Sequence, residues 1–397
     1  MAHQYRYVIV GGGLAGASAV EGIRAHDRSG SIALFGKEHH LPYDRPPLSK
    51  GLWLGKTTLA ELPVHDEAFY KSQNVHVYLG TEISAIDPKK KEATDADGTR
   101  FLYDRLLIAT GGTPRSLSFG AGAVTYFRTV DDYTLLNAAA DHLDEFLFLG
   151  GGFIGSELAA ALRMKGKKVT MVFPEEFLLQ RVLPPDLAAF VTDYYREKGV
   201  EIVSGDVPTG AERANAKSTV MTRGGKKLVA DVVVAAIGLN LHTEMARRAG
   251  LKIENGISVN TFLQTSDPFI YAAGDIAFFP SPALGKSIRI EHWNNAQVQG
   301  KHAGENMAGA DMPYAYLPYF YSDLFDLGFE AIGDLDSKLQ TFADWKDKFR
   351  EGVVYYLDDG KVKGVLLWNV WGKVDHARDL VNKKKTFSNL SHLKRLL

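Results

Sequence analysis

The chain has 397 residues, which is enough for two or three domains with cores of their own. Apolar residues make up 45% and charged residues 23%, and the net charge of -1 gives no global field that would favour nucleic acid. The chain contains no cysteine, which excludes thiolate nucleophiles, redox disulfides, cysteine-held iron–sulfur clusters and cysteine–zinc sites. We therefore expect any redox chemistry to depend on a bound cofactor, and we expect no metal site.

The sequence has no run of about 18 apolar residues, so we expect no transmembrane helix. The chain passes from Met1 almost directly into an apolar strand over residues 5–10. It lacks the basic region and cleavage site of a secretory signal, so we expect a soluble, cytoplasmic protein.

A glycine-rich turn follows the first predicted strand, residues 7–10, and leads into an alanine-rich helix over residues 17–25. Such a strand, turn and helix can bind a dinucleotide, because the glycines let the backbone approach a pyrophosphate at the helix N-terminus. A second strand over residues 31–35 precedes Glu38, which lies 22 residues after the last glycine and can accept a hydrogen bond from a ribose hydroxyl. The residues that we expect at this turn are Gly11, Gly13, Leu14, Ala15 and Gly16.

The same unit returns after a strand over residues 146–149. A helix over residues 156–165 follows its glycine turn, and a strand over residues 168–173 follows that helix. Glu175 then lies 20 residues after the last glycine of this second unit. This spacing is similar to the 22 residues that separate Glu38 from the last glycine of the first unit. The residues that we expect at this second turn are Gly150, Gly152, Phe153, Ile154 and Gly155.

The repetition extends beyond the glycine turns. A hairpin-like stretch over residues 91–103 turns at Asp97-Gly98, and another over residues 218–230 turns at Gly224-Gly225. Each leads into an apolar strand that ends in glycine seven residues after an aspartate. The sequence therefore predicts two related α/β dinucleotide domains, and two such domains imply two dinucleotides that react with each other. The strand ends contribute Ala109, Thr110 and Gly111 in the first domain, and Ile237 and Gly238 in the second.

A third element, over residues 265–275, is a short strand that ends in Gly274-Asp275. An aspartate after a glycine turn can hold a sugar-alcohol hydroxyl, which would complete the first domain. Without the surrounding motifs, the alternative for Asp275 is an aspartate that only stabilises a turn.

Three further motifs carry a family resemblance. They are P-Y-D-R-P-P-L-S-K at residues 42–50, E-H-W-N-N-A-Q at residues 291–297 and F-Y-S-D at residues 320–323. With the two glycine turns, they resemble the FAD-dependent pyridine nucleotide oxidoreductases, in particular the ferredoxin and rubredoxin reductases and the apoptosis-inducing factors. The resemblance covers essentially the whole chain. Disulfide reductases of the wider superfamily carry a redox cysteine pair near residues 42–50, whereas this chain has none.

The resemblance implies an α/β fold with two Rossmann-like domains, which bind FAD and NADH, and a C-terminal α+β interface domain. The expected FAD-binding domain comprises residues 1–114 and 241–312, with the NADH-binding domain inserted at residues 115–240. The interface domain then covers residues 313–397, and the long insertion that apoptosis-inducing factor carries there is absent.

The resemblance also implies roles for individual residues. In the family, the arginine matching Arg45 contacts FAD, and the lysine matching Lys50 lies beside the isoalloxazine and pairs with the glutamate matching Glu157. Trp293 would be an aromatic wall beside the flavin, whereas a core or interface position is the usual role of a tryptophan. The remaining cofactor contacts expected from the resemblance are Ile83, Arg128, Glu291 and His292. The candidates for the reaction itself are Lys50, Glu157, Trp293 and His292.

The expected reaction is hydride transfer from NADH C4 to flavin N5, followed by release of electrons to an acceptor. NADH is favoured over NADPH because Glu175 and Glu176 end the second strand and would repel a 2′-phosphate, although Arg181 lies nearby. A ferredoxin or rubredoxin is the expected acceptor. A redox-sensing protein with slow turnover, and an NADH:quinone or monodehydroascorbate-type reductase, are the alternatives. We expect a monomer or a homodimer.

The C-terminal segment is basic, with six Lys or Arg and one Asp over residues 376–397. Leu390, Leu393 and Leu397 have helical spacing, so the segment could dock on a membrane surface or an acidic partner. A solvated and partly frayed tail is the favoured interpretation.

Overall fold

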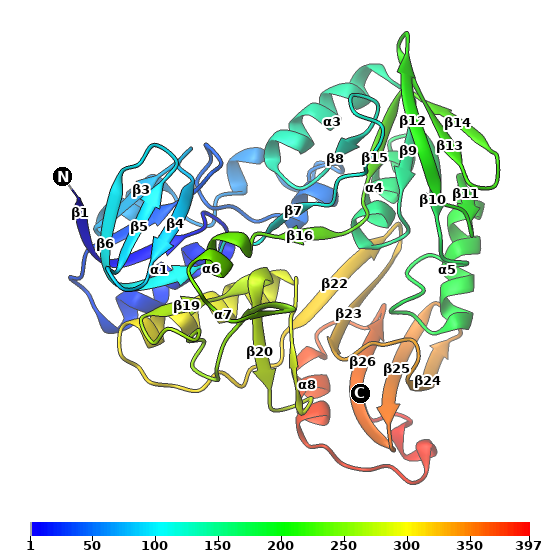
Figure 1. Ribbon diagram of the computed structural model, residues 1–397. Helices are drawn as coiled ribbons and strands as arrows, with labels where there is room; N and C mark the ends of the chain where they lie inside the picture. Colours follow the sequence, from blue (N-terminus) through cyan, green and yellow to red (C-terminus); the bar gives the residue numbers. More distant parts are fainter. Residues whose placement is uncertain (1) are drawn as a thin grey trace. The chain divides into compact units, whose positions relative to one another are not determined.

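The computed structural model describes residues 2–397 and shows two compact units (Figure 1). The first contains residues 2–44, 60–113 and 240–318, and the second contains residues 45–59, 114–239 and 319–397.

The first unit is built around a sheet in the order β3-β2-β1-β6-β5-β4, with β19 also paired to β6. The β1, β2, β3, β6 and β19 strands are parallel, while β4 and β5 continue the sheet in antiparallel pairs. The strands are β1 (His3–Val10), β2 (Ile32–Phe35), β3 (Val75–Tyr78), β4 (Ile83–Asp87), β5 (Glu92–Asp95), β6 (Arg100–Ile108) and β19 (Ile270–Ala272). The expected hairpin at Asp97-Gly98 is confirmed as the β5–β6 connection.

Both faces of this sheet are buried, because successive side chains of a strand point to opposite faces and both sets are apolar here. On β1, Val8 and Val10 belong to one hydrophobic cluster, and Tyr7 and Ile9 belong to another. The helices α1 (Leu14–His26) and α7 (Trp293–Met307) pack closely on each other. This close packing needs small residues: a Cβ on Gly300 would lie 2.3 Å from the Ala15 carbonyl oxygen.

The second unit repeats this plan with a parallel sheet in the order β11-β10-β9-β15-β8. The order β11-β10-β9-β15 matches β3-β2-β1-β6 of the first unit, which confirms the predicted duplication and the two Rossmann-like folds. A three-stranded antiparallel sheet, β12-β13-β14, corresponds to the second expected hairpin. The strands are β8 (Thr125–Tyr126), β9 (Glu145–Leu149), β10 (Lys168–Phe173), β11 (Val200–Ser204), β12 (Pro208–Ala214), β13 (Lys217–Thr222), β14 (Lys227–Ala230) and β15 (Val232–Ala235), and the helices are η1 (Pro46–Ser49), α3 (Val130–His142), α4 (Phe153–Met164) and α5 (Pro185–Glu197).

The second unit also contains a five-stranded antiparallel sheet in the order β22-β23-β26-β25-β24. In this sheet residues 352–356 pair antiparallel with residues 364–368, with Gly352 opposite Trp368 and Tyr356 opposite Gly364. The elements are β22 (Tyr319–Leu324), β23 (Leu327–Gly333), β24 (Gln340–Asp347), β25 (Glu351–Asp358), β26 (Lys361–Trp368), α8 (Val374–Asn382) and η4 (Leu390–Leu393). The predicted α+β character of the C-terminal region is therefore confirmed.

Short elements complete the chain. They are η2 (Leu59–Glu61), α2 (Glu67–Ser72), β7 (Gly112–Pro114), β16 (Leu239–Leu241), α6 (Glu244–Arg248), β17 (Ile253–Glu254), β18 (Gly256–Ser258), η3 (Gly274–Ile276), β20 (Ala277–Ser281) and β21 (Lys286–Ile288). Across residues 2–397, none of the helices is both long enough and apolar enough to cross a membrane.

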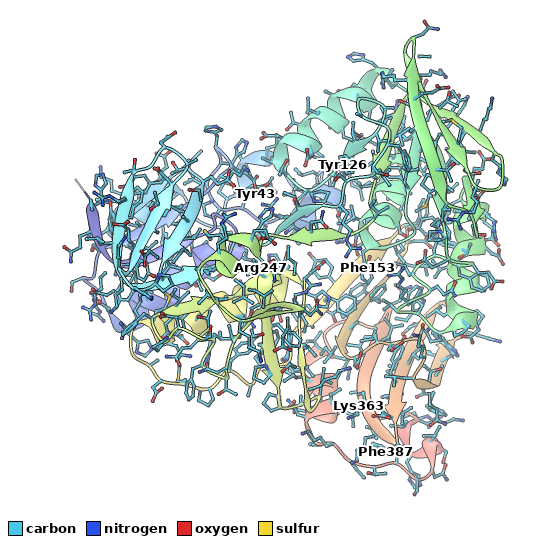
Figure 2. The ribbon with its side chains drawn as sticks, in the orientation of Figure 1. Tyr43, Tyr126, Phe153, Arg247, Lys363 and Phe387 are labelled. Carbon is cyan, nitrogen blue, oxygen red and sulfur yellow. The ribbon has the colours of Figure 1, made fainter. Side chains whose placement is uncertain are left out.

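The basic C-terminal segment is packed, so the expectation of a frayed tail is wrong. The Phe387 N–H donates to the Gly360 carbonyl at 2.7 Å, and the Arg395 N–H donates to the Asp344 carboxylate at 2.7 Å. Phe387, which is labelled in Figure 2, and Leu393 both have buried side chains. These two apolar anchors hold the segment against the sheet, while most of its charged side chains remain exposed.

Candidate functional site

The first glycine turn joins β1 to α1 in a conformation that requires glycine. Gly11 has a φ of +134°, and a Cβ on it would lie 2.2 Å from the Ala109 carbonyl oxygen. A Cβ on Gly16 would lie 2.1 Å from the Gly11 carbonyl oxygen. Gly13, by contrast, is the N-cap of α1, has no side-chain cap, and a Cβ there would meet no protein atom within 4 Å. The turn therefore leaves open space at an uncapped helix N-terminus, which fits a pyrophosphate.

The other expected residues of the first unit fall around this turn at the ends of parallel strands. Ala109, Thr110 and Gly111 follow β6, and the Ala109 N–H donates to the Val10 carbonyl at 2.8 Å. Gly274 and Asp275 follow β19, as expected for a residue that holds a sugar-alcohol hydroxyl. Leu14 and Ala15 begin α1.

Glu38 and Ile83 have different surroundings. Glu38 follows β2 and accepts a 2.6 Å hydrogen bond from the hydroxyl of Tyr43 (labelled in Figure 2), so a neighbouring tyrosine orients the carboxylate. Ile83 lies in β4 with its side chain in the hydrophobic core beside Phe101. The Ile83 side chain is therefore used for packing, and a contact of this residue with FAD would have to come from its backbone.

Trp293 is held by Asp44, a residue of the motif at residues 42–50 for which the sequence predicted no role of its own. Its indole N–H donates to the Asp44 carboxylate at 2.5 Å, and Asp44 lies 249 residues earlier in the chain. Glu291 pairs with Arg289 at 2.5 Å, and Arg289 also donates to the Asp275 carbonyl at 3.2 Å. The segment that resembles a flavin-contacting motif is thus fixed through specific polar contacts at the start of α7.

His292 is a neutral base in this structure. Desolvation lowers the pKa of its imidazole to about 4, against a smaller opposing effect from the Asp275 carboxylate. A lowered pKa favours the neutral form of the ring at neutral pH.

This lowered pKa predicts an acid-dependent loss of stability. The unfolded state binds more protons than the folded state between pH 6.5 and 4, so stability falls as the pH drops through this range. We expect a loss of about 2 to 3 kcal/mol from this group. Denaturant unfolding at several pH values should show a shallower acid-side loss for His292→Asn than for the unsubstituted chain. Equal acid-side slopes for the two proteins would contradict the assignment.

The second glycine turn, between β9 and α4, has the same construction as the first. Gly150 has a φ of +115°, and a Cβ on it would lie 2.4 Å from the Ala236 carbonyl oxygen. A Cβ on Gly155 would lie 2.5 Å from the Gly150 carbonyl oxygen, whereas a Cβ on Gly152 would meet nothing within 4 Å. Gly152 is the N-cap of α4 and again has no side-chain cap. This turn also fits a pyrophosphate.

Of the residues that follow the second turn, Phe153 packs against other aromatic rings and Ile154 is exposed. Phe153 packs its ring against Phe320 and Phe329 of the antiparallel sheet, with ring centroids 5.5 and 6.3 Å apart (Figure 2). Ile154 is 41% exposed at the start of α4, where a ligand could cover it. Ile237 and Gly238 follow β15, as the sequence predicted for this strand end.

Glu175 forms an ion pair with Arg181, the nearby cation that left the choice between NADH and NADPH open. The Arg181 guanidinium donates to one Glu175 carboxylate oxygen through two nitrogens, at 3.0 and 2.7 Å. Glu175 follows β10, where a ribose-binding carboxylate is expected. The ion pair holds Arg181 close to the Glu175 carboxylate, although the Arg181 side chain is 83% exposed.

A buried ion pair lies at the start of α4. The Lys50 ammonium is 2.8 Å from Glu157 Oε1, and the two side chains are 14% and 3% exposed. The Ser49 hydroxyl donates to Glu157 Oε2 at 2.6 Å, and the Ser322 hydroxyl donates to Glu157 Oε1 at 2.7 Å. Lys50 also lies 4.9 Å from the centre of the Tyr321 ring. Three segments therefore converge on one carboxylate, and the predicted pairing of Lys50 with Glu157 is present.

Ser49 and Ser322 were missed as partners of Glu157. Both stand inside motifs that the sequence singled out, next to Lys50 and Tyr321, and that adjacency was the available signal. Arg45 and Arg128, expected to contact FAD, lie together, since the Arg45 guanidinium donates to the Arg128 carbonyl at 2.7 Å.

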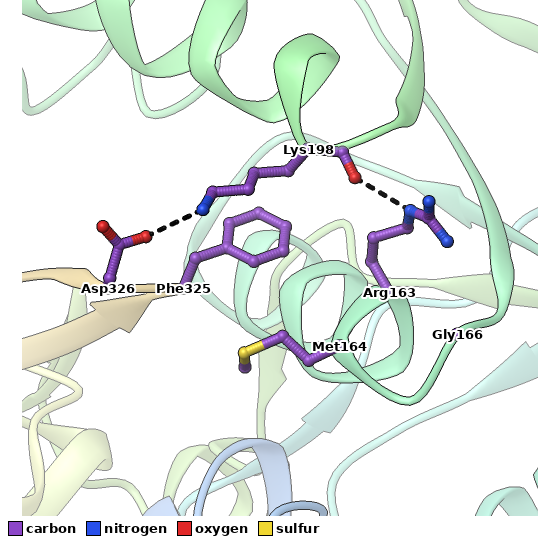
Figure 3. Close-up of a pocket in the computed structure, with 6 residues that line it drawn as sticks. All are labelled: Arg163, Met164, Gly166, Lys198, Phe325 and Asp326. Atoms are coloured by element: carbon purple, nitrogen blue, oxygen red, sulfur yellow. Dashed lines mark hydrogen bonds and ion pairs between the residues drawn. The ribbon is translucent and has the colours of Figure 1, made fainter.

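A separate cavity of about 610 Å³ lies at the ends of α4 and α5, beside the β22–β23 turn (Figure 3). The Lys198 ammonium pairs with Asp326 at 3.1 Å, and the Arg163 guanidinium donates to the Lys198 carbonyl at 2.8 Å. Because these charged groups bind each other, they hold the end of α5 against the turn of the antiparallel sheet.

Comparison with known proteins gives the class of this protein. Residues 5–300 match the family described as pyridine nucleotide-disulphide oxidoreductase, and residues 303–347 and 343–383 match the C-terminal region of mitochondrion-associated apoptosis-inducing factor. The chain therefore belongs to the pyridine nucleotide-disulphide oxidoreductase family. It is an oxidoreductase whose cofactors are FAD and NADH.

Individual relatives cover nearly the whole chain. It is 38% identical to the ferredoxin–NAD(+) reductase component of the anthranilate 1,2-dioxygenase system of Burkholderia cepacia, over 94% of this chain and 93% of that protein. It is 35% identical to apoptosis-inducing factor 1 of Dictyostelium discoideum (98% and 80% covered), and 35% identical to cytosolic monodehydroascorbate reductase 4 of Oryza sativa (92% and 91%). The solved putidaredoxin reductase in covalent complex with putidaredoxin has a TM-score of 0.90 and 32% identity, covering 96% of this chain and 93% of that one.

Proposed function

We propose that this protein is a reductase that takes electrons from NADH through FAD to a small one-electron acceptor protein of the ferredoxin or rubredoxin type. The absence of cysteine carries this proposal. A member of a disulphide oxidoreductase family without cysteine cannot pass electrons through a disulfide of its own, so they leave the flavin for an external acceptor. The similarity to the anthranilate system reductase and to putidaredoxin reductase supports a ferredoxin as that acceptor.

The assignment of cofactors to the two glycine turns is part of the proposal. The first turn, with Glu38, Ala109, Thr110, Gly111, Gly274 and Asp275, holds FAD, with further contacts from Arg45, Ile83, Arg128, Glu291, His292 and Trp293. The second turn, with Phe153, Ile154, Glu175, Ile237 and Gly238, holds NADH. The domain bounds follow as residues 1–114 and 241–312 for FAD, 115–240 for NADH and 313–397 for the interface domain.

Lys50 is the residue that acts on the reaction. With both cofactors bound, the nicotinamide supplies a hydride and the isoalloxazine ring accepts it. With FAD bound, the Lys50 ammonium would offer positive charge to the ring that receives the hydride, and the buried carboxylate of Glu157 holds that ammonium in position. Ser49 and Ser322 fix both oxygens of the carboxylate, so its orientation does not depend on Lys50 alone.

An acceptor panel read by NADH consumption tests the proposed function. The panel contains a [2Fe–2S] ferredoxin, a rubredoxin, a quinone, monodehydroascorbate and ferricyanide. The proposal expects fast turnover with ferricyanide and with at least one of the iron–sulfur proteins. The protein could turn over with ferricyanide and with the quinone or monodehydroascorbate, but with neither iron–sulfur protein. That result would overturn the proposed acceptor and leave the NADH-to-flavin step intact.

A redox-sensing role is the second candidate, because the C-terminal region matches that of apoptosis-inducing factor. In that case NADH would form a long-lived complex and change the oligomeric state. Size-exclusion chromatography with and without NADH separates the two: no shift in size together with fast turnover favours the reductase. We further propose a cytoplasmic location, which the cytosolic relative from Oryza sativa supports.

The Glu175–Arg181 pair predicts how coenzyme preference changes. Replacing Glu175 by alanine removes a carboxylate that would repel a 2′-phosphate and releases Arg181 to bind one. We expect the ratio of kcat/KM for NADPH to that for NADH to rise at least about tenfold, equivalent to about 1.4 kcal/mol. Steady-state kinetics with ferricyanide measures it.

The matched control is the double variant Glu175→Ala/Arg181→Ala, which should lose most of the gain in NADPH use. Titration with 2′,5′-ADP, followed by calorimetry, reports the same change without turnover. If the single and double variants bind 2′,5′-ADP equally well, Arg181 has no part in the preference.

A further inference from the structure

Trp371 is a large apolar side chain that is exposed and yet held in place. Its side chain is 51% exposed on the loop between β26 and α8. The indole lies directly on Gly328, because a Cβ there would come within 2.9 Å of the Trp371 ring. The Asn369 side chain fixes the loop by accepting from the Gly328 N–H at 2.8 Å and donating to the Arg350 carbonyl at 2.9 Å. An exposed aromatic ring that is already ordered loses little entropy on binding a partner.

The loop that carries Trp371 is linked to the Lys50–Glu157 ion pair through residues on one face of the antiparallel sheet. Gly328 and Glu330 are two residues apart in β23 and therefore point to the same face. The Glu330 carboxylate accepts from the Gly372 N–H at 3.3 Å, and Tyr321 lies opposite Glu330 on β22. The Tyr321 ring in turn lies under the Lys50 ammonium at 4.9 Å. Trp371 is thus the exposed end of a continuous set of contacts that begins at Lys50.

The chain from Trp371 onward is strongly basic. Residues 371–397 contain seven Lys or Arg and two Asp, a net charge of +5 in a chain whose total is -1. Within the described residues 2–397, Lys373, Lys383 and Lys394 are exposed and have no carboxylate within 4 Å. Burial raises the pKa of Glu330, whose carboxylate accepts from the Gly372 N–H next to Trp371, above its ordinary value. A basic surface of this kind attracts an acidic protein.

We propose that Trp371 and the basic segment 373–395 form the docking surface for an acidic electron-transfer protein, with Trp371 as the apolar anchor. This rests on the proposed function and adds the place at which the acceptor binds. The lysines attract the acidic partner over a distance, and the indole packs into it on contact.

The test compares Trp371→Ala with Leu135→Ala, a control that truncates a 73% exposed apolar residue on α3. For the iron–sulfur acceptor with the fastest turnover, we expect the KM to rise about tenfold or more in Trp371→Ala and to stay within about twofold in Leu135→Ala. Turnover with ferricyanide and the rate of flavin reduction by NADH should stay unchanged in both, which also shows that the variants are folded.

A second variant keeps the test independent of the indole. In Lys383→Gln/Lys384→Gln/Lys385→Gln we expect a smaller dependence of kcat/KM for the protein acceptor on ionic strength. The proposal is overturned if the KM in Trp371→Ala and the salt dependence in the triple variant both match the unsubstituted protein. If no iron–sulfur protein supports turnover in the unsubstituted protein while ferricyanide does, the proposed function fails together with this surface.

Discussion

Replacing Lys50 by methionine should lower the free energy of unfolding by about 3 to 5 kcal/mol, because it leaves the Glu157 carboxylate buried without a counter-charge. The same substitution should slow reduction of the flavin by NADH roughly 100-fold, since one preorganised charge is lost at the reacting group. Denaturant unfolding and anaerobic stopped-flow absorbance measure the two effects on the same preparations.

The double variant Lys50→Met/Glu157→Gln separates these effects. The neutral amide can still bind the Ser49 and Ser322 hydroxyls, so we expect stability to return to within about 1 kcal/mol of the unsubstituted protein. The slow flavin reduction should remain, because the positive charge is still missing. Recovery of both properties, or of neither, would show that stability and reactivity do not depend on the pair in this way.

An exposed ion pair supplies the matched control. The Lys37 ammonium lies 2.8 Å from Glu82, with side chains 71% and 53% exposed. Because water screens such a pair, Lys37→Met should change stability by less than about 1 kcal/mol and leave flavin reduction unaffected.

Replacing Gly13 by valine should give a folded protein that is purified with little or no FAD. Replacing Gly152 by valine should give a yellow protein that binds NADH at least about tenfold more weakly, a loss of about 1.4 kcal/mol or more. Both glycines have extended φ values that valine accepts, and neither would clash with protein atoms. The new side chains therefore fill only the space at the two helix N-termini.

Flavin absorbance relative to protein absorbance, and equilibrium titration with NADH, measure these two losses. Gly16→Val serves as the control for folding, since a Cβ there would lie 2.1 Å from a backbone oxygen and should destabilise the whole unit. Loss of FAD from the Gly152 variant, with normal FAD in the Gly13 variant, would reverse the assignment of the two turns.

The repeated fold could be predicted because its signals are local. The two glycine turns, their flanking strands and the two hairpins each occupy a continuous stretch of sequence, and their spacing repeats. The sheet orders then follow from the known connection of such units. The basic C-terminal segment was misjudged because its charges dominate the composition, whereas two buried side chains, Phe387 and Leu393, decide its packing.

The site was only partly predictable because its contacts join distant parts of the chain. Ser322 and Glu157 are 165 residues apart, and Asp44 and Trp293 are 249 residues apart. Ser322 and Asp44 both stand inside motifs that carry the family resemblance, but a motif indicates only that a residue matters and does not identify a partner so far away in the chain. The pairing of Lys50 with Glu157 was expected only because both positions match a family motif, and the docking role of Trp371 depends on its exposure, which the sequence does not show.

The central claim is that one chain binds FAD and NADH so that a hydride passes from the nicotinamide to the flavin. Anaerobic stopped-flow mixing of the FAD-loaded protein with NADH, repeated with NADH deuterated at C4, tests it most directly. We expect rapid bleaching of the flavin absorbance, slowed by deuterium on one face of the nicotinamide. A protein that takes up no FAD, or whose bound flavin stays oxidised under excess NADH, would contradict it.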